Sequence, residues 1–236
     1  MTAPDEMTQL SIIIPVLDEA EGIVEQLQAL QDFRAQGSEI IVVDGGSTDG
    51  TTSLAAALAD RICTSPKGRG GQMNAGAALA EGRVLLFVHA DTCLPPSAPR
   101  RISEVIADGA HWGRFDVHIV GTAPGLAVVA GMMNWRSRLT GIATGDQAIF
   151  VTKTAFTAAG GFSDIPLMED IDFSRRMRAI SRPACLAEKV STSGRRWEKH
   201  GVLRTILLMW QLRLRFFFGA SPQDLAKEYG YAPRQN

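Results

Sequence analysis

Short, mostly apolar runs alternate with segments of helical periodicity over the first ninety residues of the chain. The apolar runs cover residues 10–16, 40–43, 61–64 and 84–88. The segments with apolar residues at helical spacing cover 23–30, 52–59 and 72–80. Runs of this length are typical of strands buried on both faces, and their alternation with helices predicts successive βα units in a mainly parallel sheet flanked by helices.

The regularity weakens after residue 95, where two prolines stand together. Residues 114–120 alternate in the manner of a half-exposed strand, and residues 147–151 form another short strand-like run. Residues 126–139 fit a helix rich in small side chains. We therefore expect the second half of the chain to elaborate the sheet rather than to repeat the first half.

The C-terminal region is predicted to be helical, because apolar residues recur at helical spacing from 202 to 219 with arginines between them. The basic amphipathic part, 203–218, suits either burial in a homodimer or peripheral contact with a membrane. No linker or repeat marks a clean domain boundary. We expect one α/β domain over residues 1–200 and a helical extension over 201–236 that packs on this domain or on a partner.

Composition narrows the class of protein. The 236 residues are 45% apolar and 21% charged with a net charge of −1, which predicts a folded chain without a broad nucleic-acid surface. Three cysteines without a CxxC pair argue against a zinc site or a disulfide framework. No stretch reaches the roughly 18 apolar residues of a membrane span, and the N-terminus lacks a secretory pattern. We expect a cytoplasmic protein, with peripheral attachment to the inner face of the membrane as the alternative.

Two glycine-rich turns carry the first candidate functional residues. The turn from Asp44 to Gly50 follows an apolar run and opens a helix, so its backbone amides can approach an anion. A second glycine cluster precedes the next helix and is surrounded by Lys67, Arg69, Gln72 and Asn74. These cations and amides suit phosphates or a sugar, whereas the alternative for both turns is an ordinary exposed loop. Neither has the spacing of a dinucleotide fingerprint or a P-loop.

His89 and Asp91 follow the apolar run 84–88, where the chain leaves the predicted sheet. Ligands bind beyond the carboxyl ends of parallel strands, and Asp44 is predicted to lie at the same edge. A carboxylate there is a suitable ligand for Mg²⁺ or Mn²⁺ that bridges a diphosphate. The alternative is that Asp91 caps the following helix and that His89 is a hydrogen-bonded core residue.

Three carboxylates stand close together at Glu169, Asp170 and Asp172. On a helix, Glu169 and Asp172 share a face while Asp170 points elsewhere. The pattern fits either a surface helix with salt bridges to the arginines that follow or a general base beside a substrate hydroxyl. Further along, residues 193–197 place two guanidinium groups beside Trp197, which suits a diphosphate and a sugar.

Taken together, these segments resemble the GT-A-fold glycosyltransferases of family 2 over about residues 10–200. The segment 15–19 is similar to the family's Pro-x-x-Asn-Glu turn, and 44–49 is similar to its nucleoside turn. His89-Ala90-Asp91 stands at the Asp-x-Asp metal motif, and Glu169-Asp170 at the pair that contains the catalytic base. Gly194-Arg-Arg-Trp197 is similar to the Gln-x-x-Arg-Trp signature.

Three further segments, 68–77, 89–92 and 145–150, resemble a bacterial branch whose members are often labelled arsenosugar-biosynthesis glycosyltransferases. The resemblance implies a Rossmann-like α/β fold of the GT-A type with a C-terminal helical extension. It implies an inverting, metal-dependent enzyme that moves a sugar from a nucleoside-diphosphate sugar to a hydroxyl of a small-molecule or lipid acceptor.

The resemblance also implies roles for individual residues. Asp170 is the implied catalytic base. The implied donor-binding residues are Pro15, Glu19, Asp44, Arg69, Asn74, Ala90, Asp91 and Arg196. The residues implied to contact the sugar or the acceptor are Gln147, Glu169 and Trp197. The implied ligands of Mg²⁺ or Mn²⁺ are Asp91 and His89.

Three positions depart from the family pattern. His89 replaces the first aspartate of the metal motif, Gly45 replaces the second acid of the nucleoside turn, and Ser193 replaces the glutamine of the last signature. The last change argues against processive polymer synthesis. Two other functions remain open: a nucleotidyltransferase, although the basic loop that such enzymes carry after their first strand is missing, and a nucleotide- or sugar-binding module without catalysis.

Overall fold

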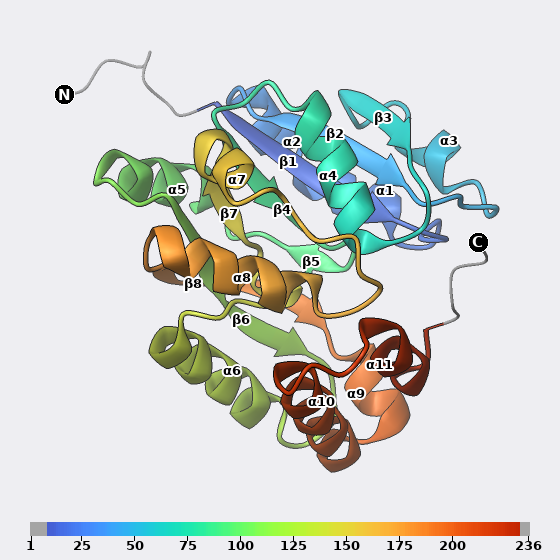
Figure 1. Cartoon of the computed structure of the whole chain (residues 1–236). Coiled ribbons are helices and arrows are strands. Elements are labelled where there is room, and N and C mark those ends of the chain that lie inside the picture. Colours follow the sequence, from blue (N-terminus) through green and yellow to red (C-terminus); the bar gives the residue numbers. More distant parts are fainter. Residues whose placement is uncertain (1–8, 232–236) are drawn as a thin grey trace.

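A computed structural model describes residues 9–231. In this part of the chain, eight strands form one sheet with the order β3-β2-β1-β4-β7-β6-β8-β5 (Figure 1). The strands are β1 Leu10–Val16, β2 Glu39–Asp44, β3 Arg61–Thr64, β4 Val84–Phe87, β5 Thr92–Cys93, β6 Trp112–Val120, β7 Phe150–Thr152 and β8 Ala184–Ser193. The first four strands in sheet order, β3, β2, β1 and β4, are parallel, so their carboxyl ends meet at one edge. The predicted βα arrangement is confirmed.

Helices cover both faces of the sheet (Figure 1). Those of the first half are α1 Ile23–Ala29, α2 Gln31–Ala35, α3 Thr51–Ala55, α4 Arg69–Leu79 and α5 Ala98–Ala107. Those of the second half are α6 Leu126–Thr140, α7 Lys153–Ala158, α8 Glu169–Ile180, α9 Arg195–His200, α10 Val202–Phe217 and α11 Pro222–Tyr229, with a 3₁₀ turn at Gly145–Gln147. Side chains of β1 alternate between the two cores: Ile12 and Ile14 join one cluster and Ile13 joins the other.

The second half differs from a simple βα repeat. Strand β7 is antiparallel to both β4 and β6, and β8 returns parallel to β6. Residue 147, predicted to begin a strand, lies instead in the 3₁₀ turn before β7. This turn places residues 144–147 at the edge of the sheet, beside the start of α8.

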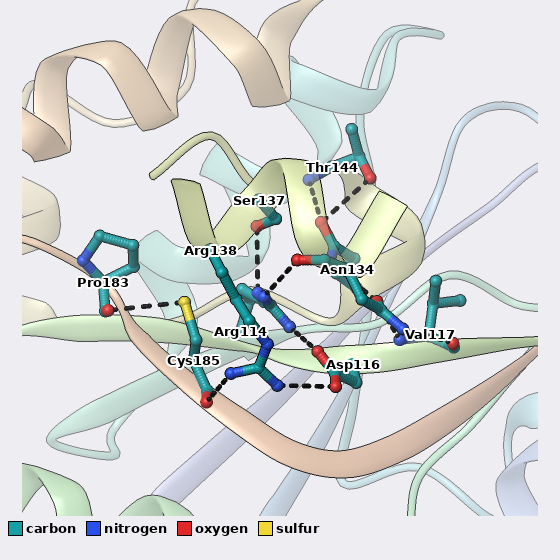
Figure 2. A network of polar contacts seen from close by, with 10 residues as sticks. Arg114, Asp116, Val117, Asn134, Ser137, Arg138, Thr144, Pro183 and Cys185 are labelled. Atoms are coloured by element: carbon teal, nitrogen blue, oxygen red, sulfur yellow. Dashed lines mark hydrogen bonds and ion pairs between the residues drawn. The ribbon is translucent and has the colours of Figure 1, made fainter. Parts of the chain in front are cut away.

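A buried polar network fixes α6 on β6 (Figure 2). The fully buried Arg114 forms an ion pair with Asp116 and donates from Nε to Oγ of Ser137 at 3.0 Å and from Nη2 to the Asn134 carbonyl at 3.1 Å. The side-chain amide of Asn134 donates to the Val117 carbonyl at 3.0 Å and accepts from its N–H at 2.8 Å. Arg114 and Asn134 thus bond across the contact between β6 and α6, which sets the position of the helix.

The C-terminal helices pack around the start of α8. Leu212 of α10 and Leu225 of α11 are fully buried in a cluster with Leu167 and Met168. Within residues 9–231, no helix combines the length and the apolar composition that crossing a membrane requires. The C-terminal region therefore borders the edge of the sheet at which α8 begins.

Candidate active site

Two adjoining cavities open beyond the carboxyl ends of the parallel strands. One has a volume of about 360 Å³ and the other about 260 Å³. Their shared lining residues are Arg69, His89, Asp91 and Tyr231. The smaller cavity is bordered by the turns after β1 and β4 and by the start of α4, whereas the larger one reaches α8, α9 and α10. Together they form one continuous candidate site at the predicted edge of the sheet.

Asp91 lies where the two cavities meet. Strand β4 ends at Phe87, and the buried amide of Gln26 holds the following turn by donating to the Thr92 carbonyl at 2.6 Å. Within residues 9–231, the Asp91 carboxylate accepts no hydrogen bond and has no cation within 4.0 Å. A carboxylate without protein partners at the junction of the two cavities is available to a ligand.

His89 packs against the 3₁₀ turn rather than standing free in the cavity. Its Nδ1 lies 3.4 Å from Oδ1 of Asp146, and its side chain is only 12% exposed. A Cβ added to Gly145 would lie 2.4 Å from Cε1 and Nε2 of the His89 ring, so a glycine is needed there for the ring to fit. The Asp146 side chain is itself half-exposed, so its partial burial raises its pKa less than the hydrogen bond and charge of His89, together with the charge of Arg69, lower it.

Glu169 and Asp170 begin α8, and both line the larger cavity. The carboxylate of Asp170 accepts hydrogen bonds from the backbone N–H of Gly145 at 2.9 Å and of Ile171 at 2.7 Å, which fix its orientation. Glu169 is 6% exposed, and its burial, followed by the charge of Asp170, raises its pKa to about 7. Asp172 lies apart from them, in an ion pair with Arg176 at 2.9 Å.

The smaller cavity brings together Pro15, Glu19, Arg69 and Ala90. Burial raises the pKa of Glu19, although the charge of Arg195 opposes this effect. The turns after β1 and β2 are tied to each other, because the Thr48 N–H donates to Oδ1 of Asp18 at 2.8 Å. This tie gives Glu19 a fixed place at the rim of the cavity.

Three of the predicted site residues make internal contacts and line neither cavity. Asp44 accepts hydrogen bonds from the N–H groups of Gly46 and Ser47 and so orders its own turn. Asn74 donates to and accepts from the backbone of Phe162, at 2.8 and 2.9 Å. Gln147 is fully buried, and its side-chain oxygen accepts from the Thr144 N–H at 3.2 Å.

The structure accounts for glycine at position 45. The amide of Gln72 donates to the carbonyls of Val16 and Val43, both at 2.9 Å, and so bridges the carboxyl ends of β1 and β2. A Cβ on Gly45 would lie 3.1 Å from Nε2 of this glutamine. The acid that the family pattern carries at position 45 would therefore crowd the bridge.

Arg196 of α9 and Arg69 of α4 face tyrosines at the C-terminal end of the described chain. Arg196 lies with its guanidinium carbon 3.5 Å from the ring centre of Tyr229, and its Nη2 donates to the Tyr229 carbonyl at 2.8 Å. Arg69 faces the ring of Tyr231 at 5.9 Å. Trp197 lines the larger cavity next to Arg196. Two cations suited to a diphosphate thus already contact aromatic rings.

Several lining residues escaped the sequence analysis: Asp146, Arg213, Tyr229 and Tyr231. They come from a 3₁₀ turn, from α10 and α11 and from the residues just after α11, and only the folded chain places them beside α8. The Gly-Asp-Gln stretch at 145–147, noted as part of the branch resemblance, was the one available signal for Asp146.

A divalent cation fits this site only if substrate phosphates and water supply most of its ligands. Among the described residues, no three His, Cys, Asp or Glu side chains are grouped to hold a metal ion. Mg²⁺ and Mn²⁺ sites commonly use one or two carboxylates and complete the coordination with substrate phosphates and water. The unpartnered carboxylate of Asp91 suits that arrangement. The described residues provide too few grouped ligands to coordinate the ion by protein side chains alone.

Comparison with models of protein families identifies the family of this chain. The model of glycosyl transferase family 2 matches residues 11–150, more than half of the chain. The chain belongs to this family. A similar curated relative, the uncharacterized glycosyltransferase alr2836 of Nostoc sp., is 31% identical over 104 residues, which cover 41% of this chain and 32% of that protein. The chain thus spans about a third of the length of this relative.

Solved structures show the same fold. The chain is similar to a mannosyltransferase of Pyrobaculum calidifontis in complex with GDP-Man and Mn²⁺, with a TM-score of 0.62, 18% identity and coverage of 81% of this chain and 58% of the other. It is also similar to S. aureus TarS in complex with UDP-GlcNAc, with a TM-score of 0.64, 19% identity and coverage of 78% and 58%. The predicted GT-A fold is confirmed.

Proposed function

We propose that the protein transfers a sugar, with inversion, from a nucleoside-diphosphate sugar to a hydroxyl group of its acceptor. The observation that carries this proposal is the placement of Asp91 and Asp170 on the wall of one cavity, with Arg69 and Arg196 beside them. Two carboxylates with separate environments and two cations are the groups needed to hold a diphosphate and to activate an acceptor.

The smaller cavity is the proposed nucleotide side. Pro15, Glu19 and Ala90 form its wall, and Arg69 reaches from it toward the larger cavity. Asp44 contributes by ordering the turn between β2 and α3. The two structural neighbours contain GDP-Man and UDP-GlcNAc, so either a purine or a pyrimidine nucleotide is compatible with this fold.

Asp91 is the residue that we assign to a divalent cation. Mg²⁺ or Mn²⁺, when bound, would neutralise the diphosphate and the charge that develops on the leaving nucleotide. His89 could bind the ion only if its ring turned away from Gly145 and Asp146, so we assign it to positioning of the 3₁₀ turn. The N–H of Gly145, which belongs to this turn, donates a hydrogen bond to the carboxylate of Asp170.

Asp170 is the proposed general base. Its carboxylate takes the proton of the acceptor hydroxyl as the acceptor oxygen bonds to the anomeric carbon and the bond from that carbon to the diphosphate oxygen breaks. Base catalysis of this kind contributes roughly 10²–10⁴-fold in rate. Glu169, Trp197 and the wall around them form the proposed sugar and acceptor subsite, with Gln147 supporting it from the interior.

A thermal-shift screen tests the donor site directly. We expect UDP or GDP to raise the melting temperature only together with Mn²⁺, because mass action stabilises the folded state that binds the ligand. Asp91→Asn should abolish the Mn²⁺-dependent part of the shift. Asp108→Asn, at an exposed site at the end of α5, is the matched control and should behave as the wild type. An unchanged shift in Asp91→Asn would contradict the assigned role.

A further inference from the structure

Helices α6 and α10 expose two apolar stripes. Their members recur every three or four residues, and each is between 47% and 77% exposed. On α6 they are Val128, Met132, Trp135 and Leu139, and on α10 they are Leu203, Leu207, Trp210, Leu214 and Phe217. An apolar surface of this extent marks a site of interaction with a protein or a membrane.

An apolar groove lies between the two stripes and leads to the proposed active site. It has a volume of about 270 Å³ and is lined by Met132, Trp135, Ile206 and Trp210 among other residues of the two helices. The groove and the larger cavity share four residues, Asp146, Trp197, Met209 and Arg213. A ligand in the groove would therefore have one end beside α8.

Two arginines that line the groove have buried donors without a hydrogen-bond partner, and one of them, Arg213, also lines the larger cavity. In the described part of the chain, Nε and Nη2 of Arg136 and Nε of Arg213 are buried without a hydrogen-bond partner, and neither side chain has an acidic group within 4.0 Å. Burial, followed by the charge of Arg213, lowers the pKa of Arg136 to about 10. Buried guanidinium nitrogens without hydrogen-bond partners are costly, and an anionic ligand would supply the missing acceptors. The carboxylates of Asp170 and Asp146 act on both arginines only through their charge.

Charge decides between the possible occupants. Helices α6 and α10 carry five arginines and no acidic residue. Arg138 and Arg215 pair with Asp116 and Glu228 of other elements, which leaves Arg136, Arg204 and Arg213 without an acidic group within 4.0 Å among the described residues. A second copy of the chain docked on this face would bring like charges together, whereas an anionic lipid surface would complement them.

We propose that the α6–α10 face docks on an anionic membrane and that the groove binds a lipid acceptor, whose chain lies between the apolar stripes and whose phosphate lies between Arg136 and Arg213. This assignment rests on the proposed function and extends it by naming the class of acceptor. It accounts for the apolar stripes, the connection to the cavity and the unsatisfied guanidinium groups together.

Vesicle binding tests the docking step. The full chain should co-sediment with vesicles containing phosphatidic acid at least tenfold more than with pure phosphatidylcholine. The double variant Trp135→Ser, Trp210→Ser should lose at least tenfold in binding, because it removes two large side chains from the stripes. Absence of co-sedimentation, or a stable dimer that this double variant dissociates, would overturn the proposal.

Soluble short-chain lipids test the phosphate site apart from the membrane surface. Tryptophan fluorescence should report dihexanoyl phosphatidic acid binding at least tenfold more tightly than dihexanoyl phosphatidylcholine or inorganic phosphate, since Trp135, Trp197 and Trp210 line the groove. Arg213→Gln should lose at least tenfold, whereas Arg204→Gln, on the same helix but exposed, should stay within twofold. Equal losses in the two variants, or equal binding of inorganic phosphate, would overturn the site.

The donor assay on the same preparations separates the two proposals. Mn²⁺-dependent binding of UDP or GDP without any lipid binding would refute the lipid site and leave the transferase intact. Lipid binding without nucleotide binding would instead refute the proposed transferase activity.

Discussion

The burial of Glu169 predicts a stability that depends on pH. The side chain is 6% exposed, and its burial, with the nearby charge of Asp170, raises its pKa from 4.5 to about 7. The native protein therefore holds a proton on Glu169 over a range of pH in which the unfolded chain has released it. Glu169→Gln keeps the shape and the neutral charge of the protonated form, so the substitution removes this difference.

The sign and the magnitude of this pH dependence follow from the linkage between proton binding and unfolding. Where the folded state binds more protons than the unfolded state, the free energy of unfolding falls as pH rises. For Glu169 the stabilising protonated form is complete below pH 4.5 and is lost as pH rises through about 7. At about 1.4 kcal/mol per pH unit, the wild type should lose roughly 2–3 kcal/mol relative to Glu169→Gln between pH 5 and pH 8.

Urea unfolding at several pH values measures this difference. Glu169→Gln should have nearly the stability of the wild type at pH 5 and should be the more stable protein at pH 8. Glu21→Gln, which removes an exposed carboxylate, should show no such divergence. A difference between Glu169→Gln and the wild type that stays constant from pH 5 to pH 8 would refute the argument from burial.

Three further substitutions probe other contacts. Gly145→Ala forces a methyl group against the His89 ring and should cost about 1–3 kcal/mol of unfolding free energy, much of which His89→Ala should restore in the double variant. Arg114→Leu should cost about 2–4 kcal/mol in urea unfolding because it removes the buried hydrogen bonds to Ser137 and Asn134, while Arg138 still pairs with Asp116, and an unchanged midpoint would disprove this. Tyr229→Ala removes the ring that Arg196 faces, although the hydrogen bond to the backbone carbonyl remains, and should tighten UDP or GDP binding about 2–5-fold by calorimetry, whereas Tyr229→Phe should leave it unchanged.

The part of the fold that could be predicted is the part in which strands are buried on both faces. Strands β1, β2 and β4 are nearly continuous apolar runs, so their burial on both faces can be predicted from their own sequences. Strand β8 was not predicted, because half of its sequence Ala-Cys-Leu-Ala-Glu-Lys-Val-Ser-Thr-Ser is polar and it contains no continuous apolar run. Its position depends on pairing with β6 and β5, which is a long-range property.

In the candidate site, too, some residues can be predicted from the local sequence pattern and others depend on long-range packing. Asp91 and Asp170 follow or begin elements with clear periodicity, and the structure places both in the larger cavity. Asn74 and Gln147 were assigned to ligands by analogy, but the structure places their amides on backbone groups of loops that the sequence does not locate. Arg213 lies on a helix whose apolar pattern was recognised, yet only the packing of α10 beside α6 turns this arginine toward the cavity.

Cleavage of a nucleoside-diphosphate sugar is the most direct test of the central claim. In the presence of Mn²⁺, the purified wild-type protein should release the nucleoside diphosphate from a matching donor. Asp170→Asn should slow the release by about 10²–10⁴-fold while binding the donor as tightly as the wild type. Release by Asp170→Asn at the rate of the wild type, or binding of the donor by the wild type without any release, would contradict the account.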